Sequence, residues 1–236
     1  MIFGLEHIVS AGLMSLASIY SCPQVQPGPV YIQTRNGTPK YYYHVPSAQL
    51  GNFQIDTTFS RHDNEIYVVG GVTQGKILIS RQIQMNIMSM RGVDAHCASI
   101  KQIQVVLDYQ PDVYIANEYR PGTCRYNTTM QHEVQHVNLD IITLNEFIPR
   151  IQANIQRAVN SIPPMQPVTK NQLPQVQEWI GQQVQAAAQN AIAEMDQVRR
   201  ARHQRIDNRE EYTRLSNACA HEPNPIPVPG QPQRRR

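Results

Sequence analysis

The chain has 236 residues, of which 41% are hydrophobic and 17% are charged, and its formal net charge at pH 7 is +3. This length allows one sizeable domain, alone or with appended segments. The terminal arginines at 234–236 alone supply three positive charges, so the composition does not indicate a nucleic-acid-binding protein.

An uncharged, mostly apolar run occupies residues 8–20. Its length suits the apolar part of a signal peptide better than a membrane span, although the preceding residues 1–7 carry no Lys or Arg. Ser21-Cys22 resembles the end of a bacterial lipobox. We therefore expect residues 1–22 to be a signal peptide or a lipoprotein signal, and the protein to be periplasmic or secreted. A lipid anchor at Cys22 would be its membrane attachment, and a buried N-terminal helix is the alternative.

The chain has four cysteines and no C-x-x-C pair, which argues against a cysteine-based zinc site: Cys22, Cys97, Cys124 and Cys219. In an exported protein these cysteines could form disulfides. We expect Cys97 to pair with Cys124. Cys219 would then be left over if Cys22 is lipidated or removed.

A linker over residues 23–29 precedes a region, 30–119, that is rich in β-branched and aromatic runs. Gly, Asn, Asp and Pro separate six expected strands: Val30–Thr34, Tyr41–Val45, Glu65–Val69, Lys76–Met85, Ile103–Tyr109 and Asp112–Tyr119. Gln110-Pro111 is predicted to join the last two strands as a hairpin. Residues 81–101 are ambiguous and could instead hold a helix.

Residues 132–136 read His-Glu-Val-Gln-His. Residues four apart lie on one face of a helix, so His132 and His136 could both bind one Zn²⁺ ion while Glu133 handles protons beside it. With 8 His among 236 residues, and ten Glu, chance is expected to produce about 0.01 such pentads. The pentad therefore predicts a zinc site with His132 and His136 as metal ligands and Glu133 as the catalytic base.

The surroundings of the pentad are typical of a helix. Thr128 and Gln131 fit a T-x-x-Q capping box, so the helix is expected to begin near Thr128. A helical stripe of apolar residues follows: Met130, Val134, Val137, Ile141 and Leu144. The stripe lies nearly opposite the two histidines, which predicts a helix with its back in the core and an open histidine face. The alternative is two surface histidines on an ordinary amphipathic helix.

Beyond the pentad the chain is expected to be helical. Pro149 is predicted to end or kink the first helix near Phe147, with a second helix running to Val159. A Pro-rich linker over 162–174 precedes a long helix over about 175–216, whose apolar residues recur every 3.6 positions. Residues 217–236 are rich in Pro and Arg, and we expect a disordered tail.

Strands that lead into an H-E-x-x-H helix, followed by more helices, resemble the zincin metallopeptidases, and within them small exported bacterial proteins predicted to be zinc proteases. The resemblance covers about residues 60–200, but only the pentad is specific. It implies an α+β catalytic domain over 23–161, in which a small antiparallel or mixed sheet precedes the active-site helix. It also implies that the strand Asp112–Tyr119 lies along the cleft and pairs with an extended peptide substrate.

The chain departs from that family's patterns in its third zinc ligand. Metzincins have Gly and His three and six residues after the second histidine, where this chain has Leu139 and Ile142. Other zincins take a Glu from a later helix. Four residues are weak candidates: Glu146, Glu178, Glu194 and His203. Asp140 shares the histidine face and is expected to orient His136 rather than to bind the metal.

Two function classes follow. The first is a zinc-dependent peptidase acting on a peptide or protein, with Glu133 activating a zinc-bound water. Tyr119, Tyr126 and His96 could stabilise the oxyanion, although each could equally be structural. The second is a non-enzymatic interaction or scaffold protein of the cell envelope, with a structural or degenerate pentad. Nucleic-acid binding through the Arg-rich helix would rest on charge alone, and the sequence does not predict an oligomeric state.

Overall fold

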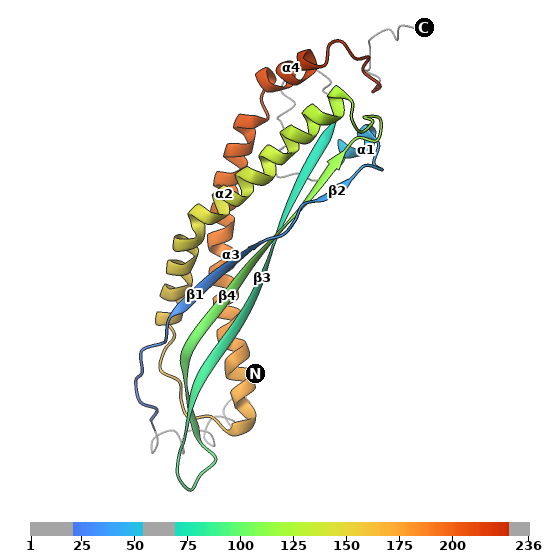
Figure 1. Ribbon diagram of the computed structural model, residues 1–236. Coiled ribbons are helices and arrows are strands. Elements are labelled where there is room, and N and C mark those ends of the chain that lie inside the picture. Colours follow the sequence, from blue (N-terminus) through green and yellow to red (C-terminus); the bar gives the residue numbers. More distant parts are fainter. Residues whose placement is uncertain (1–20, 54–68, 227–236) are drawn as a thin grey trace, which may run out of the picture. The chain divides into compact units, whose positions relative to one another are not determined.

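The computed structural model describes residues 21–53 and 69–226 and has an α+β fold, as predicted (Figure 1). A four-stranded mixed sheet is followed by helices. The elements in chain order are β1 (Val30–Asn36), β2 (Lys40–Tyr42), α1 (Ser47–Leu50), β3 (Gly71–Ser89), β4 (His96–Ile115), α2 (Cys124–Asn160), a 3₁₀ turn (Lys170–Gln172), α3 (Leu173–Ile206) and α4 (Arg209–Ala218). The expected strand Glu65–Val69 lies, apart from its last residue, outside the described residues.

β3 and β4 form a long antiparallel hairpin. Met90 N donates to Ala95 O at one end, at 2.9 Å, and Ala116 N donates to Gly70 O at the other, at 2.8 Å. The turn between the strands contains Gly92, whose φ of +83° is a conformation that side chains with a Cβ rarely adopt. A helix within residues 81–101, which the sequence left open, is therefore excluded.

β1 and β2 follow one another along the other edge of β4. β2 pairs with β4 in parallel, with Lys40 opposite Asp112. Hydrogen bonds from Gly28 N to Ile100 O and from Gly37 N to Tyr109 O flank β1. The β4 partners advance in the same direction along the chain as residues 28 and 37, so β1 also runs parallel to β4. The sheet is mixed because β3 is antiparallel to the same strand.

The hairpin predicted at Gln110-Pro111 is wrong, because β4 runs unbroken through both residues. Extension of the β2 register by one residue places Pro111 opposite Pro39, between the end of β1 and the start of β2. Proline has no backbone N–H. Its absence at Pro111 is tolerated because neither β1 nor β2 pairs with β4 at that position. The prediction that residues 112–119 form an edge strand along a cleft is also wrong, because Asp112 and its neighbours lie between β2 and β3.

α2 is one helix, which begins earlier and ends later than predicted. Thr128 is not its N-cap but lies inside the first turns, where its hydroxyl donates to the Cys124 carbonyl at 2.9 Å. Pro149 does not end the helix, although it removes one backbone hydrogen bond. Leu144 and Ile151, on either side, are fully buried, and this packing holds the helix through the proline.

α3 buries part of the stripe that the sequence predicted, at Ile180, Val184, Ala191 and Met195, and it also buries Ala188, which lies beside the stripe. The single long helix expected over 175–216 is nevertheless wrong, since the chain breaks at Asp207-Asn208. The Asn208 side chain accepts from Glu211 N at 2.8 Å and so caps α4. The tail expected from residue 217 is folded as far as Ile226, and residues 227–236 lie outside the described part.

The structure contains two disulfides, Cys22–Cys97 and Cys124–Cys219. The predicted Cys97–Cys124 pair is therefore wrong. The Cys22 sulfur is bonded to Cys97 and cannot also carry a lipid. Two disulfides are typical of proteins that fold outside the cytoplasm.

No helix within the described ranges is long and apolar enough to cross a bilayer. The expected signal at residues 1–22 lies, apart from its last two residues, outside these ranges.

The chain divides into two compact units, each built from separate stretches of sequence. The described parts of Met1–Ile32, Arg81–Val105 and Ile151–Gln189 form the first unit, which contains the Cys22–Cys97 disulfide. The described parts of the remaining sequence form the second unit. It contains the pentad, the Cys124–Cys219 disulfide and an apolar cluster around Leu50 and Ile226. All side chains of the candidate site belong to this second unit.

Candidate metal site

Three buried donor atoms converge beside α2. His132 Nε2 lies 3.1 Å from Asp207 Oδ1, and His136 Nε2 lies 3.0 Å from the same oxygen. The two Nε2 atoms are 3.1 Å apart. The three side chains are 4%, 4% and 8% exposed, and they form a group that could hold a metal ion.

Local structure explains why the three donors meet. His132 and His136 are one helical turn apart on α2, so their imidazoles point the same way. Asp207 lies in the break between α3 and α4, and its own N–H still bonds to His203 O at 2.8 Å. Asn208 caps α4 directly afterwards. The break therefore turns the Asp207 carboxylate out of the helical path and towards the histidines.

A chain of hydrogen bonds sets the tautomer of His136. His203 Nε2 lies 2.6 Å from Asp140 Oδ1, and a carboxylate can only accept, so His203 carries its proton on Nε2. Its Nδ1 then accepts from His136 Nδ1, at 2.7 Å. His136 is left with a lone pair on Nε2, which points at the centre of the group.

Asp140 is itself held from two sides. The Tyr109 hydroxyl donates to its Oδ2 at 2.7 Å, and Arg199 lies 3.5 Å from the same oxygen. Burial opposes ionisation of Asp140, but the hydrogen bond from His203 and the charge of Arg199 outweigh it and lower the pKa of this carboxyl. The expectation that Asp140 orients His136 is thus met indirectly, through His203.

His132 has an equivalent partner on α4. Its Nδ1 lies 3.4 Å from Glu211 Oε1, and the Arg214 guanidinium holds this carboxylate at 2.6 and 2.7 Å. Since Glu211 can only accept, His132 carries a proton on Nδ1 and presents a lone pair on Nε2. The Tyr212 hydroxyl donates to Asp207 Oδ1 at 3.3 Å, which fixes the third donor.

Two imidazole lone pairs and a carboxylate oxygen therefore face one another at 3.0–3.1 Å. Three acceptors this close repel one another unless a cation or a proton lies between them. Zn²⁺ in tetrahedral geometry, with bonds of about 2.0–2.1 Å, separates its ligand atoms by about 3.3 Å. The donor set is one that zinc uses, and a shift of a few tenths of an ångström would bring the three atoms to this spacing.

The pKa shifts of these groups describe the metal-free protein, in which a histidine Nε2–H donates to Asp207 instead of presenting a lone pair. Burial disfavours the charged form of His132, but the hydrogen bond with Asp207 and the nearby Glu133 outweigh burial and raise the pKa of the imidazole. Burial likewise opposes ionisation of Asp207, yet the hydrogen bonds from His132 and His136 lower the pKa of its carboxyl. Without metal, a proton shared among these groups replaces the cation.

Glu133 is buried beside the histidines and contacts β3. Its Oε2 accepts from the Thr73 hydroxyl at 2.9 Å. The backbone of Gly71 lies so close that a Cβ there would sit 2.6 Å from Glu133 Oε1. Burial raises the pKa of the Glu133 carboxyl. The printed contacts of this carboxyl are thus with β3, and its charge interacts with those of His132 and His136.

The sequence predicted an open histidine face on α2. In the structure, this face is covered by the end of α3 and by α4. Both faces of α2 are buried, because Val137 and Leu144 lie in the apolar core while His132 and His136 lie under polar residues of later helices. An apolar stripe reveals only the core face. Polar burial on the other face depends on partners more than 60 residues away in sequence.

The four weak candidates for a third ligand have other roles. Glu146 pairs with Arg202, Glu178 with Arg81 at 3.3 Å, and Glu194 with Arg150 at 3.0 Å. These three assignments are corrected, because each carboxylate neutralises a guanidinium instead. His203 does belong to the site, but it bonds to His136 through Nδ1 instead of adding a donor to the group of three.

The candidate oxyanion donors lie elsewhere. Tyr119 packs against the apolar cluster around Leu50, and Tyr126 packs against the ring of Tyr43. His96 bonds to Ser89 and Asp94 in the first unit. Tyr212, which the sequence did not single out, is instead the tyrosine whose hydroxyl reaches the donor group.

Sequence reasoning missed Asp207, although a signal for it was present. Asn208 is a favoured N-cap residue, and Glu210 and Glu211 follow in the positions that favour a helix N-terminus. This pattern predicts a new helix start at 208. The apolar stripe, which has helical spacing across this region, led instead to the prediction of one continuous helix.

No family model, no curated protein and no solved structure matches this chain.

Proposed function

We propose that this protein is an extracytoplasmic zinc-dependent hydrolase, with a peptidase as the preferred class, and that His132, His136 and Asp207 hold the zinc ion. The observation that carries the proposal is the convergence of two imidazole lone pairs and one carboxylate oxygen, each oriented by a hydrogen-bond partner. Ligating histidines in zinc sites commonly donate their second N–H to such a partner.

The number of protein ligands favours catalysis over a structural role. Structural zinc sites are closed by four protein ligands, whereas catalytic sites use three and keep one position for water or substrate. Within the described part of the chain, the candidate group has three members, His132, His136 and Asp207. A His₂Asp set of this kind leaves a fourth position for the reaction.

Glu133 is the residue proposed to move protons in the reaction. Bound zinc lowers the pKa of a coordinated water to about 7 and polarises a carbonyl group. Glu133 takes the proton of the attacking water and returns it to the leaving amine. Thr73 holds the Glu133 carboxylate through its hydrogen bond to Oε2.

The substrate class and the compartment follow from the same reasoning. A peptide or an exposed segment of a protein supplies the carbonyl and the leaving amine that this residue set would act on. Disulfides persist in the periplasm or after secretion, so we place the protein there. Nucleic-acid binding is not part of the proposal.

A second function is favoured by one observation, the burial of the donor group. Glu211 and Tyr212 of α4 contact His132 and Asp207, and His132 is only 4% exposed. A closed zinc site that joins α2 to the α3–α4 break would stabilise a non-enzymatic interaction or scaffold protein of the cell envelope.

The experiment that separates these functions compares the oxidised wild-type protein with two variants. Zinc content is measured by mass spectrometry after dialysis, and hydrolysis is measured with a fluorescently labelled unfolded protein. We expect about one zinc per chain in the wild type and in Glu133→Gln, with hydrolysis at least about 100-fold slower in the variant. Asp207→Ala should lose zinc, while the matched His44→Ala change, at an exposed histidine, should alter neither quantity.

Each result has one meaning. Stoichiometric zinc with no hydrolysis by the wild type, together with unfolding on chelation, would support the structural function and reject the hydrolase. A wild-type protein that retains no zinc from a zinc-containing medium would reject both. Equal hydrolysis by the wild type and Glu133→Gln would reject the role of Glu133.

A further inference from the structure

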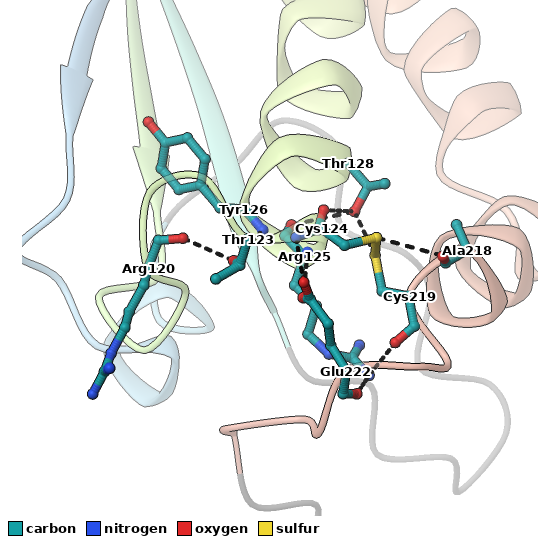
Figure 2. The surroundings of a disulfide bond; sticks show 9 residues. All are labelled: Arg120, Thr123, Cys124, Arg125, Tyr126, Thr128, Ala218, Cys219 and Glu222. Carbon is teal, nitrogen blue, oxygen red and sulfur yellow. Dashed lines mark hydrogen bonds between the residues drawn. A yellow bond between two sulfur atoms is a disulfide. The ribbon is translucent and has the colours of Figure 1, made fainter.

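The Cys124–Cys219 disulfide joins the first residue of α2 to the residue that follows α4, as Figure 2 shows. The two cysteines are 95 residues apart, and the loop that they close contains the whole donor group. His132 comes eight residues after Cys124, and Asp207 comes twelve residues before Cys219. The disulfide therefore ties together the helix that carries two donors and the segment that carries the third.

The position of α4 depends on its ends more than on its own packing. The helix has ten residues, all described, and none of them is buried. A helix of this length is marginal by itself in water. One end follows Asp207, which is one of the three proposed metal ligands, and the other is held by the disulfide at Cys219, which is fully buried. Loss of the disulfide would release the second end.

Non-covalent contacts at the same end are weaker. The Glu222 carboxylate accepts from the backbone N–H groups of Cys124 and Arg125, at 2.8 and 3.2 Å, and so caps the start of α2. The Arg125 guanidinium donates to the carbonyls of Cys219 and Glu222. Figure 2 shows this cluster around the sulfur atoms. Hydrogen bonds near a surface contribute little each, so the covalent bond is the main tether.

α4 also supplies two of the groups that orient the metal ligands. Glu211 accepts from His132 Nδ1, and Tyr212 donates to Asp207 Oδ1. Loss of such a partner typically weakens metal binding by about 10–100-fold. The chain path from His132 to Asp207 is 75 residues, whereas the path through the disulfide is about 20 residues. Loop-closure statistics alone favour the shorter path by roughly sevenfold.

We infer that the Cys124–Cys219 disulfide is a redox latch of the metal site, so that the site reaches its full zinc affinity only after this bond has formed. This inference rests on the proposed zinc site. Bond formation removes two electrons and two protons from the two thiols. A disulfide-donating protein accepts them by thiol–disulfide exchange and is itself reduced to a dithiol. Zinc loading is thereby coupled to the arrival of the chain in an oxidising compartment.

The second disulfide of the chain provides a matched control. Cys22–Cys97 lies in the first unit and closes a loop of similar length, with a separation of 75 residues, that contains none of the donors. The test compares wild type, Cys124→Ser/Cys219→Ser and Cys22→Ser/Cys97→Ser, with zinc affinity measured by competition against a chromogenic chelator. We expect the first double variant to bind zinc at least about tenfold more weakly, and the second to stay within about threefold of wild type.

Equal affinity in the wild type and Cys124→Ser/Cys219→Ser would overturn the inference, and so would the same loss in both double variants. Neither result would touch the proposed function, which fails instead if the wild type itself binds no zinc. The two failures are therefore distinguishable.

A second measurement needs no variant and covers the case in which Cys124→Ser/Cys219→Ser does not fold. Coupling is reciprocal, so zinc must stabilise the disulfide as much as the disulfide favours zinc. In a glutathione redox buffer, with each disulfide followed by thiol labelling and mass spectrometry, saturating zinc should lower the reduction potential of Cys124–Cys219 by about 30 mV for a tenfold coupling. Cys22–Cys97 should not shift. An unchanged Cys124–Cys219 potential would reject the latch.

Discussion

His136 and His203 face each other through their Nδ1 atoms, which lie 2.7 Å apart between two nearly parallel rings. One of the two nitrogens must donate and the other must accept. Asp140 determines which nitrogen donates, because its carboxylate accepts a hydrogen bond from the Nε2–H of His203. The Nδ1 of His203 is then the acceptor. The metal-facing nitrogen of His136 is thus kept free of a proton by a carboxylate that the metal would not contact.

Replacement of His203 tests this chain of hydrogen bonds from Asp140 to His136. His203→Ala removes the acceptor for His136 Nδ1, and zinc binding should weaken by about 10–100-fold. His203→Gln can still accept through its amide oxygen, so it should recover part of the loss. Chelator competition measures all three affinities, with His221→Ala, at an exposed histidine, as the control. A loss in His203→Gln as large as in His203→Ala would argue that His203 acts only through packing.

The contact between β3 and Glu133 is tested by Gly71→Ala. The added Cβ would lie 2.6 Å from Glu133 Oε1 and 2.7 Å from Thr129 Cγ2, so buried groups must shift. We expect the free energy of unfolding to fall by about 1–3 kcal/mol. Urea titration measures it. The matched change Gly51→Ala meets its nearest atom at 3.9 Å and should be close to neutral, so equal effects at the two glycines would contradict this packing.

Asp140 makes metal-free stability depend on pH. Its folded pKa is lowered below the ordinary value of 3.8, because hydrogen bonds and Arg199 outweigh burial. The stabilisation is therefore present above that ordinary value and is lost as the pH falls through the folded pKa. Asp140→Asn should be about 1–3 kcal/mol less stable than wild type near pH 7, and the difference should shrink below about pH 4. Urea titrations in the presence of a chelator measure both curves, and parallel curves down to pH 2 would refute this role.

Short-range patterns explain which parts of the fold could be predicted. β-branched runs before residue 119 and 3.6-residue periodicity after it are local, and they predicted the strand-rich and helical halves correctly. Pro111 was misread as a turn residue because β4 tolerates it opposite the gap between β1 and β2, and the strand pairing that creates this position is not visible in the sequence. The helix was predicted to end or kink before Pro149, but the packing of Leu144 and Ile151 outweighs the one hydrogen bond that the proline removes.

The candidate site also has a part that local sequence patterns predict and a part that depends on long-range contacts. The pentad is local, so the helix and the facing of His132 and His136 could be predicted. Asp207 lies at a break that interrupts an otherwise regular helical stripe, and its contacts with His132 and His136 join residues 75 and 71 positions apart. The expected Cys97–Cys124 pair failed for this reason, since spacing along the chain does not report which cysteines meet.

The most direct test of the zinc site is anomalous diffraction at the zinc edge from crystals of the oxidised, full-length protein grown with zinc. We predict one strong peak, with His132 Nε2, His136 Nε2 and an Asp207 carboxylate oxygen each about 2.0–2.2 Å from it. A map without a peak among these three residues, or with zinc bound by other side chains instead, would contradict the account.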